Sequence, residues 1–306
     1  MESQFIEWLR ERLPNHPQLL LGPGDDAAVL RLASQADCVV TCDALTEGVD
    51  FLLSENDPVR IGRKALAVNL SDLAAMAARP MAVVISLVLP RTNAFELATK
   101  LYEGLLPLAA EFNVAIAGGD TNTWDGGLVI NITAIGETTA RGPLKRGGAR
   151  PGDEILVTGE LGGSILGKQF DFTPRVREAL LLHEQFEIHA ATDISDGLEL
   201  DLSHIAEESH CGVLLYPEKI PIAPAARQLS ALRNDGISPN THARTDGEDF
   251  ELVLAVPPHE AARLIATQPL AAPLTSIGQF VAEPGFWDAA SDGTRTQVAP
   301  QGFRHR

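Results

Sequence analysis

The stretch Val68–Met76, VNLSDLAAM, places one carboxylate in a run that otherwise predicts a buried helix. Apolar side chains recur here at the three- and four-residue spacing of one helix face; they are Ala65, Leu66, Val68, Leu70, Leu73 and Met76. Asp72 interrupts this pattern together with Asn69 and Ser71. A carboxylate in apolar surroundings is costly unless a cation or hydrogen-bond donors meet it. The stretch therefore predicts either a capping or solvated aspartate, or one that faces a bound cation.

Further groups of aspartates favour the bound cation. Each lies in a turn or at the end of an apolar run, and they are Gly24-Asp25-Asp26, Asp43, Gly118-Gly119-Asp120 and Asp193-Ile194-Ser195-Asp196. Mg²⁺ binds carboxylate and phosphate oxygens and uses only one or two protein carboxylates per ion. This many carboxylates therefore predicts several Mg²⁺ ions and a highly charged phosphate substrate. We interpret the groups as one metal–phosphate centre built around the helix that carries Asp72.

The charge of the chain limits its partners. With 24 basic and 41 acidic residues the formal net charge is −17, which argues against nucleic acid and anionic membrane as main partners because both need a basic surface. An anionic substrate would also be repelled unless divalent cations lie between it and the protein. We therefore expect metal ions wherever a phosphate substrate binds.

Other features of the composition indicate a cytoplasmic protein. No apolar run reaches transmembrane length, and Met1–Arg10 does not resemble a secretory signal. The three cysteines, Cys38, Cys42 and Cys211, form neither a zinc pattern nor an even set for disulfides. We expect reduced thiols in a reducing compartment.

Hydrophobic patterning divides the 306 residues into two expected domains, 1–140 and 141–306. In the first domain we expect helices over 4–13, 57–78 and 94–112, and strands over 27–32, 38–42, 81–89, 114–117 and 128–136. In the second we expect strands over 154–158, 213–215 and 250–256, helices over 174–186 and 198–208, and a turn-rich tail after Pro284. The expected architecture is an α/β domain followed by an α+β domain.

The segment Arg141–Asp153, RGPLKRGGARPGD, is the best candidate for a linker between these domains. It is rich in Gly, Pro and Arg, has almost no apolar residue, and is the most basic segment of the chain. Two interpretations stay open: a solvated linker, or a phosphate clamp made of Lys145, Arg146 and backbone amides. The turn Gly159–Gly163 opens onto a helix and is a second plausible anion site.

Several nucleotide and hydrolase motifs are absent from the sequence. There is no G-x-x-x-x-G-K-[ST], no H-R-D or D-F-G set, no G-x-G-x-x-G that opens a βαβ unit, no G-x-S-x-G and no HExxH. This excludes a P-loop enzyme and a protein kinase of the usual type. Clustered aspartates beside a basic glycine-rich segment instead favour ATP-dependent phosphoryl transfer without a P-loop.

Six motifs, in order and over nearly the whole chain, resemble those of the thiamine-monophosphate kinases: GPGDDAAVL, VNLSDLAAM, GGDT, RGGARPGDEILVTG, DISDGL and DGEDFEL. That family belongs to the aminoimidazole ribonucleotide synthase-like ATP-binding enzymes. The resemblance implies an N-terminal α/β domain with a mixed sheet that pairs with a second subunit in a homodimer, a C-terminal α+β domain, and ATP in the cleft between them. The implied reaction passes the γ-phosphate of ATP to thiamine monophosphate, giving thiamine diphosphate.

The same resemblance assigns roles to single residues. The implied magnesium ligands or metal-holding positions are Asp26, Thr41, Cys42, Asp43, Asp72, Asp120, Asp193 and Asp196. The implied nucleotide contacts are Tyr102, Gly119, Asp120, Arg146 and Ser195, and the implied substrate contacts are Asp50, Glu248 and Phe303. Among all of these, we expect catalysis to depend most on Asp72, Asp120 and Arg146.

The sequence departs from the family pattern mainly around the acceptor. A usual histidine is Asp50, an arginine is lost at Thr123, and an additional acid appears at Asp246; a usual hydroxyl residue is Cys42. The metal and ATP residues look intact, whereas the acceptor pocket is altered and more acidic. Two alternatives follow: a sister enzyme of the same superfamily with a different acceptor, or a catalytically silent nucleotide-binding protein, for which eroded aspartates would be expected.

Overall fold

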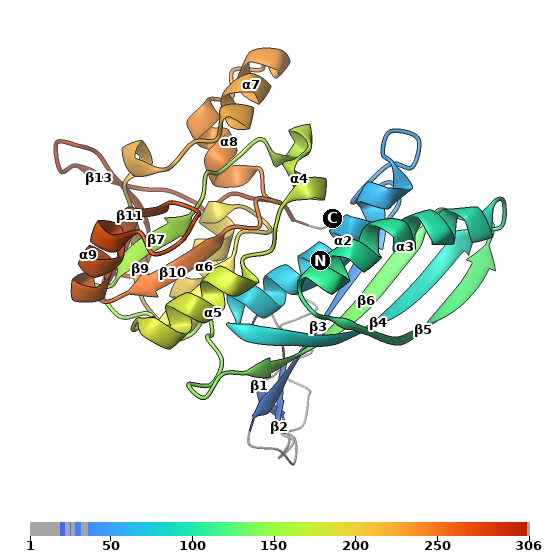
Figure 1. The fold of residues 1–306 in the computed structure, drawn as a ribbon. Coiled ribbons are helices and arrows are strands. Elements are labelled where there is room, and N and C mark those ends of the chain that lie inside the picture. The colour runs from blue at the N-terminus through green and yellow to red at the C-terminus, as the bar shows by residue number, and fades with distance from the viewer. Residues whose placement is uncertain (1–18, 22–24, 26–27, 32–35, 305–306) are drawn as a thin grey trace.

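The computed structural model describes residues 19–21, 25, 28–31 and 36–304, which form two β-sheets, each with its own helices (Figure 1). The helix expected over 4–13 lies outside these residues, and so does Asp26. Among the described helices, none is long and apolar enough to cross a membrane.

Within the described residues the first sheet has six strands, in the order β1-β2-β3-β6-β4-β5. Their bounds are β1 Leu19–Leu21, β2 Ala28–Arg31, β3 Asp37–Thr46, β4 Ala78–Pro90, β5 Ala115–Trp124 and β6 Val129–Thr138. Neighbouring strands are antiparallel except β4 and β5, which are parallel because a helix connects them. The expected mixed α/β architecture is thus confirmed.

Two strands are longer than expected, and both changes affect candidate site residues. β3 pairs with β6 as far as Thr46, so Asp43 lies inside the strand and not at its end. β5 pairs with β4 as far as Trp124, so Gly118, Gly119 and Asp120 are strand residues and not a turn. In both cases continued backbone pairing with a neighbouring strand outweighs the local preference of Asp and Gly for turns.

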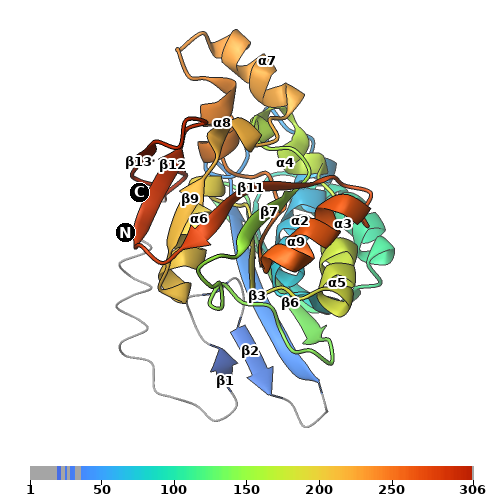
Figure 2. The same cartoon turned by 90° about the vertical axis from the view of Figure 1, so that its left-hand side faces the viewer.

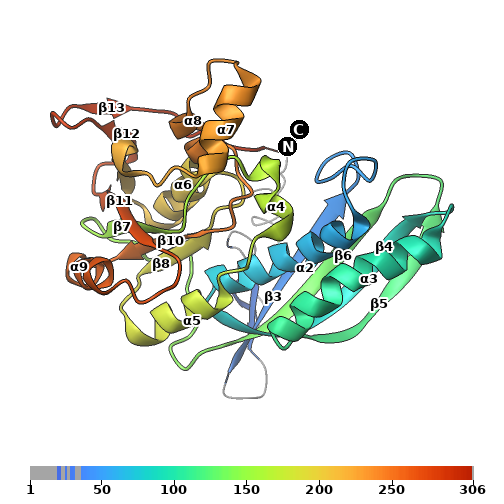
Figure 3. The ribbon, with the colours of Figure 1, turned by 45° about the horizontal axis from the view of Figure 1, so that its top comes forward.

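Helices α2 (Pro58–Ala75) and α3 (Ala94–Glu111) lie side by side over one face of the first sheet (Figures 1 and 3). As expected, Asp57 caps α2 by accepting a hydrogen bond from the Val59 N–H at 3.0 Å, and Pro58 occupies the first turn. A Cβ on Gly104 of α3 would lie 1.7 Å from the Val59 carbonyl oxygen, so the two helices touch through their backbones. This contact and the cap fix the position of α2.

The opposite face of the first sheet is covered by no described helix. Side chains directly opposite each other on neighbouring strands share a face, and the pairing Ala44–Asn131–Ser86–Asp120 forms one row across β3, β6, β4 and β5. We call this side of the sheet, with Cys42 and Thr133 in the next row, the open face. It also exposes apolar Val84, which is 38% accessible.

In the described part of the second half, seven strands form a sheet in the order β13-β12-β9-β11-β7-β10-β8. Their bounds are β7 Glu154–Thr158, β8 Ala190–Asp193, β9 Gly212–Leu215, β10 Leu252–Val256, β11 Leu274–Val281, β12 Gly285–Ala289 and β13 Arg295–Gln297. The turn-rich tail was the wrong expectation. β12 pairs in parallel with β9 and buries Phe286, and β13 adds to it at the sheet edge (Figure 2).

Helices complete the second half and confirm its α+β character. They are η1 Ser164–Leu166, α4 Lys168–Asp171, α5 Val176–Gln185, α6 Leu198–Ser209, η2 Pro217–Lys219, α7 Pro224–Arg233, α8 Pro239–Thr245 and α9 Pro258–Thr267. α5 packs beside α2, and one continuous apolar core joins α2 residues such as Leu66 and Leu70 to Leu182 of α5 and Leu254 of β10. Helix α2 therefore packs against both halves of the chain.

The basic segment between the sheets is not a solvated linker. The Leu144 N–H donates to the Met76 carbonyl at the end of α2, and the Ala191 N–H of β8 donates to the Lys145 carbonyl, both at 3.0 Å. Further along, Ser209 Oγ accepts the backbone N–H groups of Gly148 and Ala149. Since elements on both sides hold it, the segment has a fixed course between the two halves.

Candidate active site

A cavity of about 1080 Å³ lies between the two halves of the molecule. Its walls come from β3, the loop after it, α2, the η1–α4 segment, the loops after β8 and before β10, and the tail. It gathers most of the residues singled out in the sequence: Thr41, Cys42, Asp43, Asp50, Asp72, Arg146, Ser195, Asp196, Glu248 and Phe303. Asp25 also lines it.

Two of the carboxylates expected to hold metal, Asp72 and Asp193, make hydrogen bonds at α2. Asp72 accepts a hydrogen bond from the Thr41 hydroxyl of β3, so helix and strand meet at these two side chains. Asp193 ends β8, is buried, and accepts a hydrogen bond from the hydroxyl of Ser71, the neighbour of Asp72. Asp193 therefore lies beside α2 but behind the cavity wall, whereas Asp43, Asp72 and Asp196 line the cavity itself.

Among the described residues, no three side chains of His, Cys, Asp or Glu form a ready-made metal site. The donors on the cavity wall are nevertheless of the hard oxygen type that Mg²⁺ prefers, and Mg²⁺ commonly completes its coordination with water and substrate phosphates. The donor set therefore fits ions that bind together with a phosphate substrate better than a closed structural metal site. Cys42 is the exception, and its sulfur accepts hydrogen bonds from Asn131 Nδ2 at 3.3 Å and Thr133 Oγ1 at 3.4 Å on the open face.

Three predicted nucleotide contacts lie away from the cavity of their own chain. Tyr102 is on α3, where burial raises the pKa of its hydroxyl. Gly119 is on β5, and a Cβ there would lie 1.9 Å from the Ile85 carbonyl oxygen, so the position needs glycine. Asp120 is exposed on the open face, separated from β3 by β6 and β4. Their roles stay predictions.

Arg146 and its neighbour Lys145 differ in environment. The Arg146 backbone N–H donates to Asp25 Oδ2 at 3.0 Å, and its Nε donates to Thr192 Oγ1 at 3.3 Å. Arg146 is half-buried at the cavity wall, whereas Lys145 is exposed. Of the two basic residues, Arg146 is therefore the one placed to meet a ligand in the cavity.

The acids that distinguish this sequence at the acceptor positions bond to the protein itself. Asp50 Oδ2 accepts the Thr46 backbone N–H at 2.7 Å. Asp246 accepts the Gly163 N–H at 3.2 Å and lies 2.9 Å from His242 Nδ1. The lost arginine position, Thr123, lies on β5 and not on the cavity wall. The residues that depart from the family pattern therefore alter the acceptor side of the cavity less than the added charges of Asp50 and Asp246 indicate.

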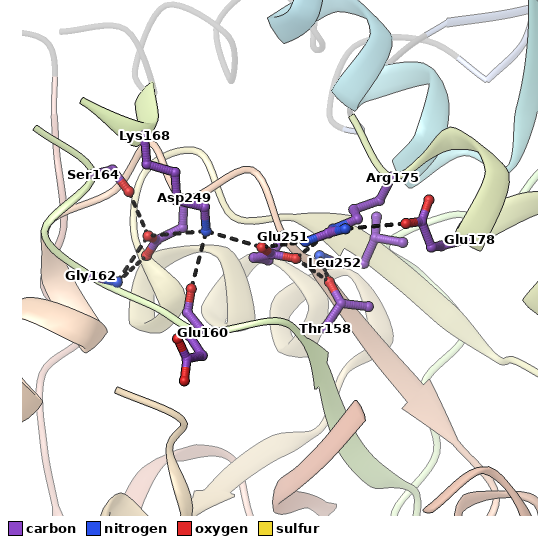
Figure 4. Close-up of polar contacts among 10 residues, drawn as sticks. All are labelled: Thr158, Glu160, Gly162, Ser164, Lys168, Arg175, Glu178, Asp249, Glu251 and Leu252. Carbon is purple, nitrogen blue, oxygen red and sulfur yellow. Dashed lines mark hydrogen bonds and ion pairs between the residues drawn. The ribbon is translucent and has the colours of Figure 1, made fainter. Parts of the chain in front are cut away.

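A buried ionic network that was not predicted from the sequence supports the cavity on the side of the η1–α4 segment (Figure 4). The Glu251 carboxylate accepts hydrogen bonds from the Arg175 guanidinium at 2.7 and 2.8 Å, from Lys168 Nζ at 3.0 Å and from the Thr158 hydroxyl at 2.7 Å. Both Asp249 oxygens accept the Gly162 N–H at 2.9 Å, and Ser164 Oγ donates to Asp249 at 2.6 Å. The network anchors the η1–α4 segment, whose Ile165 and Leu166 line the cavity.

This network also corrects one expectation. The turn Gly159–Gly163 was a plausible anion site, but the N–H groups of Gly162 and Gly163 bond to the protein's own carboxylates, those of Asp249 and Asp246. The N–H groups of the turn thus bind two carboxylates of the protein and no anion from solution. A spacing of 87 residues between Gly162 and Asp249 left no local signal from which this pairing could be predicted.

Two halves that each carry a sheet and helices, with a carboxylate-lined cavity between them, define an AIR synthase related protein. The model "AIR synthase related protein, N-terminal domain" matches residues 24–138, and "AIR synthase related protein, C-terminal domain" matches residues 150–286. The thiamine-monophosphate kinase of Rhodopirellula baltica is 42% identical over 100% of this chain and 97% of its own. The chain belongs to the thiamine-monophosphate kinase family.

Solved structures agree with this family. The structure of AaThiL complexed with AMPPCP and TMP superimposes with a TM-score of 0.83 and 26% identity, over 100% of this chain and 96% of that chain. Thiamine-monophosphate kinase from Stenotrophomonas maltophilia K279a superimposes with a TM-score of 0.73 and 34% identity, over 95% of each chain. The likeness therefore extends over both halves.

Asp249 predicts a pH dependence of stability. Burial raises the pKa of its carboxyl from 3.8 to about 6, against the opposing effects of Lys168, Ser164 and Gly162. Because the folded-state pKa is the higher one, the stability contributed by the neutral carboxyl is complete below pH 4 and is lost as the pH rises through 6. We expect the free energy of unfolding of wild type, minus that of Asp249→Asn, to fall by about 3 kcal/mol between pH 4 and 7.

Denaturant unfolding of wild type and Asp249→Asn between pH 4 and 7 measures this difference in free energy. The contributions of the other titrating groups cancel, because both proteins contain them. Asp292→Asn is the control, because the Thr294 N–H lowers the pKa of that exposed carboxyl. The free energy of unfolding of wild type, minus that of Asp292→Asn, should rise slightly between pH 4 and 7. A difference for Asp249→Asn that is constant with pH would contradict the prediction.

Proposed function

We propose that this protein transfers the γ-phosphate of ATP to thiamine monophosphate and so forms thiamine diphosphate. The observation that carries the proposal is the cavity between the two halves, which Asp43, Asp72 and Asp196 line together with Arg146 and Glu248. Carboxylates that can hold divalent cations, together with a guanidinium, suit a polyphosphate. A further carboxylate suits the cationic thiazolium ring of a thiamine acceptor.

The proposed roles follow the cavity and the family pattern. By the family pattern, magnesium would be held by Asp26, Thr41, Cys42, Asp43, Asp72, Asp120, Asp193 and Asp196. Bound Mg²⁺ supplies neutralisation of phosphate charge. Arg146 and Ser195 would orient the nucleotide, together with Tyr102 and Gly119, and the acceptor would lie against Asp50, Glu248 and Phe303.

The proposed chemistry is direct in-line transfer, in which positioning and charge neutralisation do most of the catalysis. The nucleophile is an oxygen of the acceptor phosphate. A phosphate monoester has a second pKa of about 6, so this oxygen is largely deprotonated at neutral pH. No strong general base is needed, and the carboxylates are left to hold cations.

We infer a homodimer that pairs the open faces of two first sheets. The exposed Val84 and the row that ends at Asp120 lie on this face, which no described helix covers. The dimer would surround Asp120 with the partner's strands.

We also infer a division into domains 1–140 and 141–306, because the first sheet ends at Thr138 and the second begins at Glu154. We infer a cytoplasmic location, supported by the three free thiols.

A sister enzyme with a different acceptor is the second candidate, because Asp50 and Asp246 are unusual for the family. The backbone and histidine contacts of these two acids weaken that case. The third candidate, a silent nucleotide-binding protein, is opposed by the aspartates that line the cavity.

Incubation of the protein with ATP, Mg²⁺ and a panel of acceptors separates the three candidates. The panel contains thiamine monophosphate, unphosphorylated thiamine and unrelated phosphate monoesters, and the products are resolved by chromatography. We expect thiamine diphosphate and ADP in equal amounts. A preferred product from another acceptor would favour the sister enzyme, and ATP binding without any product would favour the silent protein.

The first mutational prediction concerns Asp72. Asp72→Asn removes a metal ligand but keeps an oxygen that can accept the Thr41 hydrogen bond. We expect kcat to fall by at least about 10²-fold, Mg²⁺-dependent ATP affinity by calorimetry to fall as well, and the melting temperature to change little. Asp125→Asn, on an exposed aspartate paired with Arg91, is the matched control. Wild-type kcat in Asp72→Asn would refute the assignment.

The second mutational prediction concerns the basic segment Arg141–Asp153. If Arg146 donates to transferring phosphate oxygens, Arg146→Ala should lower kcat by roughly 10²-fold. Arg146→Lys should recover only part of this, because a lysine offers a point charge and not a planar fork of donors. Lys145→Ala, on the exposed neighbour, should resemble wild type. Steady-state kinetics on the three variants tests this, and equal kcat values would exclude the phosphate clamp.

The third concerns assembly. Val84→Glu should convert the dimer to a monomer, because it places a charge in the centre of the proposed interface. Ile265→Glu is the matched control, since Ile265 on α9 is equally exposed, at 37% against 38%, and lies in the second half. Light scattering at micromolar concentration measures both. A monomeric wild type would overturn the proposed dimer.

A further inference from the structure

Lys64 is a buried cation that the proposed chemistry does not yet use. It lies on α2, two turns before Asp72, with only 1% of its side chain accessible. Among the residues that the structure describes, it is the only lysine or arginine in the buried class. A buried ammonium is costly unless partners compensate it, so its surroundings have to supply that compensation.

Three oxygens surround the Lys64 ammonium. Nζ lies 2.5 Å from Glu248 Oε1, 3.0 Å from Gln169 Oε1 and 3.1 Å from the Asp50 carbonyl oxygen. An ammonium group has three N–H donors, so each donor has one acceptor. The acceptors belong to the loop after β3, to α4 and to the loop before β10, which are three separate walls of the cavity.

A ring contact fixes the lysine further. Nζ lies 5.1 Å from the ring centroid of Phe170, within the range of a cation–π contact, and the Arg60 guanidinium lies 5.2 Å from the same ring. Phe170 follows Gln169 on α4 and also lines the cavity. Lys64 therefore holds a short helix of the second half as well as two loops.

Glu248 depends on this lysine for its charge and its position. Its φ of +55° is in the left-handed region, which is unfavourable for a non-glycine residue, and its N–H bonds to the Ser195 carbonyl at 2.7 Å. Burial raises the pKa of the Glu248 carboxyl, Lys64 lowers it, and Asp50 raises it. The Glu248 side chain is 37% accessible at the cavity, whereas only 1% of the Lys64 side chain is accessible.

We propose that Lys64 is a positioning residue for the acceptor: buried in the cavity wall, it holds Glu248, the Asp50 loop and Gln169 in one arrangement. It thereby sets the affinity for the cationic acceptor and has no part in ATP binding. The inference rests on the proposed function in one respect, which is that Glu248 contacts the acceptor. Lys64 itself touches neither substrate.

Lys64→Met tests the proposal, because methionine fills a similar unbranched volume without charge. We expect the KM for thiamine monophosphate to rise roughly 10- to 100-fold, as for a lost hydrogen bond to a charged group. The KM for ATP and kcat should stay within about threefold of wild type. Lys100→Met, on an exposed lysine paired with Glu96 on α3, is the control and should change neither. Equal rises in both KM values would overturn the proposal.

A double-mutant cycle shows whether Lys64 acts through Glu248. In a Glu248→Gln background, Lys64→Met should change the acceptor KM by less than about threefold, because the partner carboxylate is already absent. The double variant removes both charges, so it stays informative even if Lys64→Met alone folds poorly. An undiminished effect in that background would assign Lys64 a purely structural role.

A titration without substrates separates this inference from the proposed reaction. The carboxyl ¹³C signal of Glu248, assigned by its loss in Glu248→Gln, reports the pKa of that group. The pKa should rise in Lys64→Met, and an unchanged pKa would overturn the inference whatever the acceptor is. A wild-type enzyme that makes no thiamine diphosphate would instead overturn the proposed function, while the titration still reports on Lys64.

Discussion

The burial of helix α2 between the two halves is the constraint on which the rest of the structure depends. One side of α2 packs on the first sheet and on α3, and other residues reach α5 and β10 in the same core. Every polar group on such a helix needs a partner, since it has little access to water. Ser71 bonds to Asp193, Asp72 accepts from Thr41, and Lys64 reaches three oxygens. The partners of these side chains make up much of the cavity wall.

Buried charges in α2 and in the second half each have partners within hydrogen-bond distance. Glu251 has two cations and a hydroxyl, Asp249 has a backbone N–H and a hydroxyl, and Lys64 has a carboxylate and two neutral oxygens. Such pairs contribute little net stability, because desolvation offsets most of their attraction. Their effect is to specify one arrangement of the loops around the cavity, since removal of one partner leaves the other charge buried.

Sequence patterning predicted the elements with strong periodicity and the residues with recognisable motifs. Helix α2, its Asp57 cap and the aspartates of the cavity were all expected from local spacing or from the family pattern. The strand at Asp120 was missed because pairing with β4 is a long-range interaction. Lys64 and the Glu251 network were missed for the same reason: apart from the Asp50 carbonyl, 14 residues from Lys64, the partners of Lys64 and Glu251 lie 76 to 184 residues away. A lysine inside an apolar helix face was the available signal.

The spacing of Lys64 and Asp72 along α2 has a consequence for selectivity. Eight residues of α-helix span about 12 Å, and both side chains line the same cavity. In the proposed reaction, the cationic group of the acceptor lies against Glu248, which Lys64 holds, and the acceptor phosphate lies near Asp72. Molecules of matching charge but different length between these groups would be discriminated by reach. Changes in the surrounding loops could alter which ring is accepted without altering that distance.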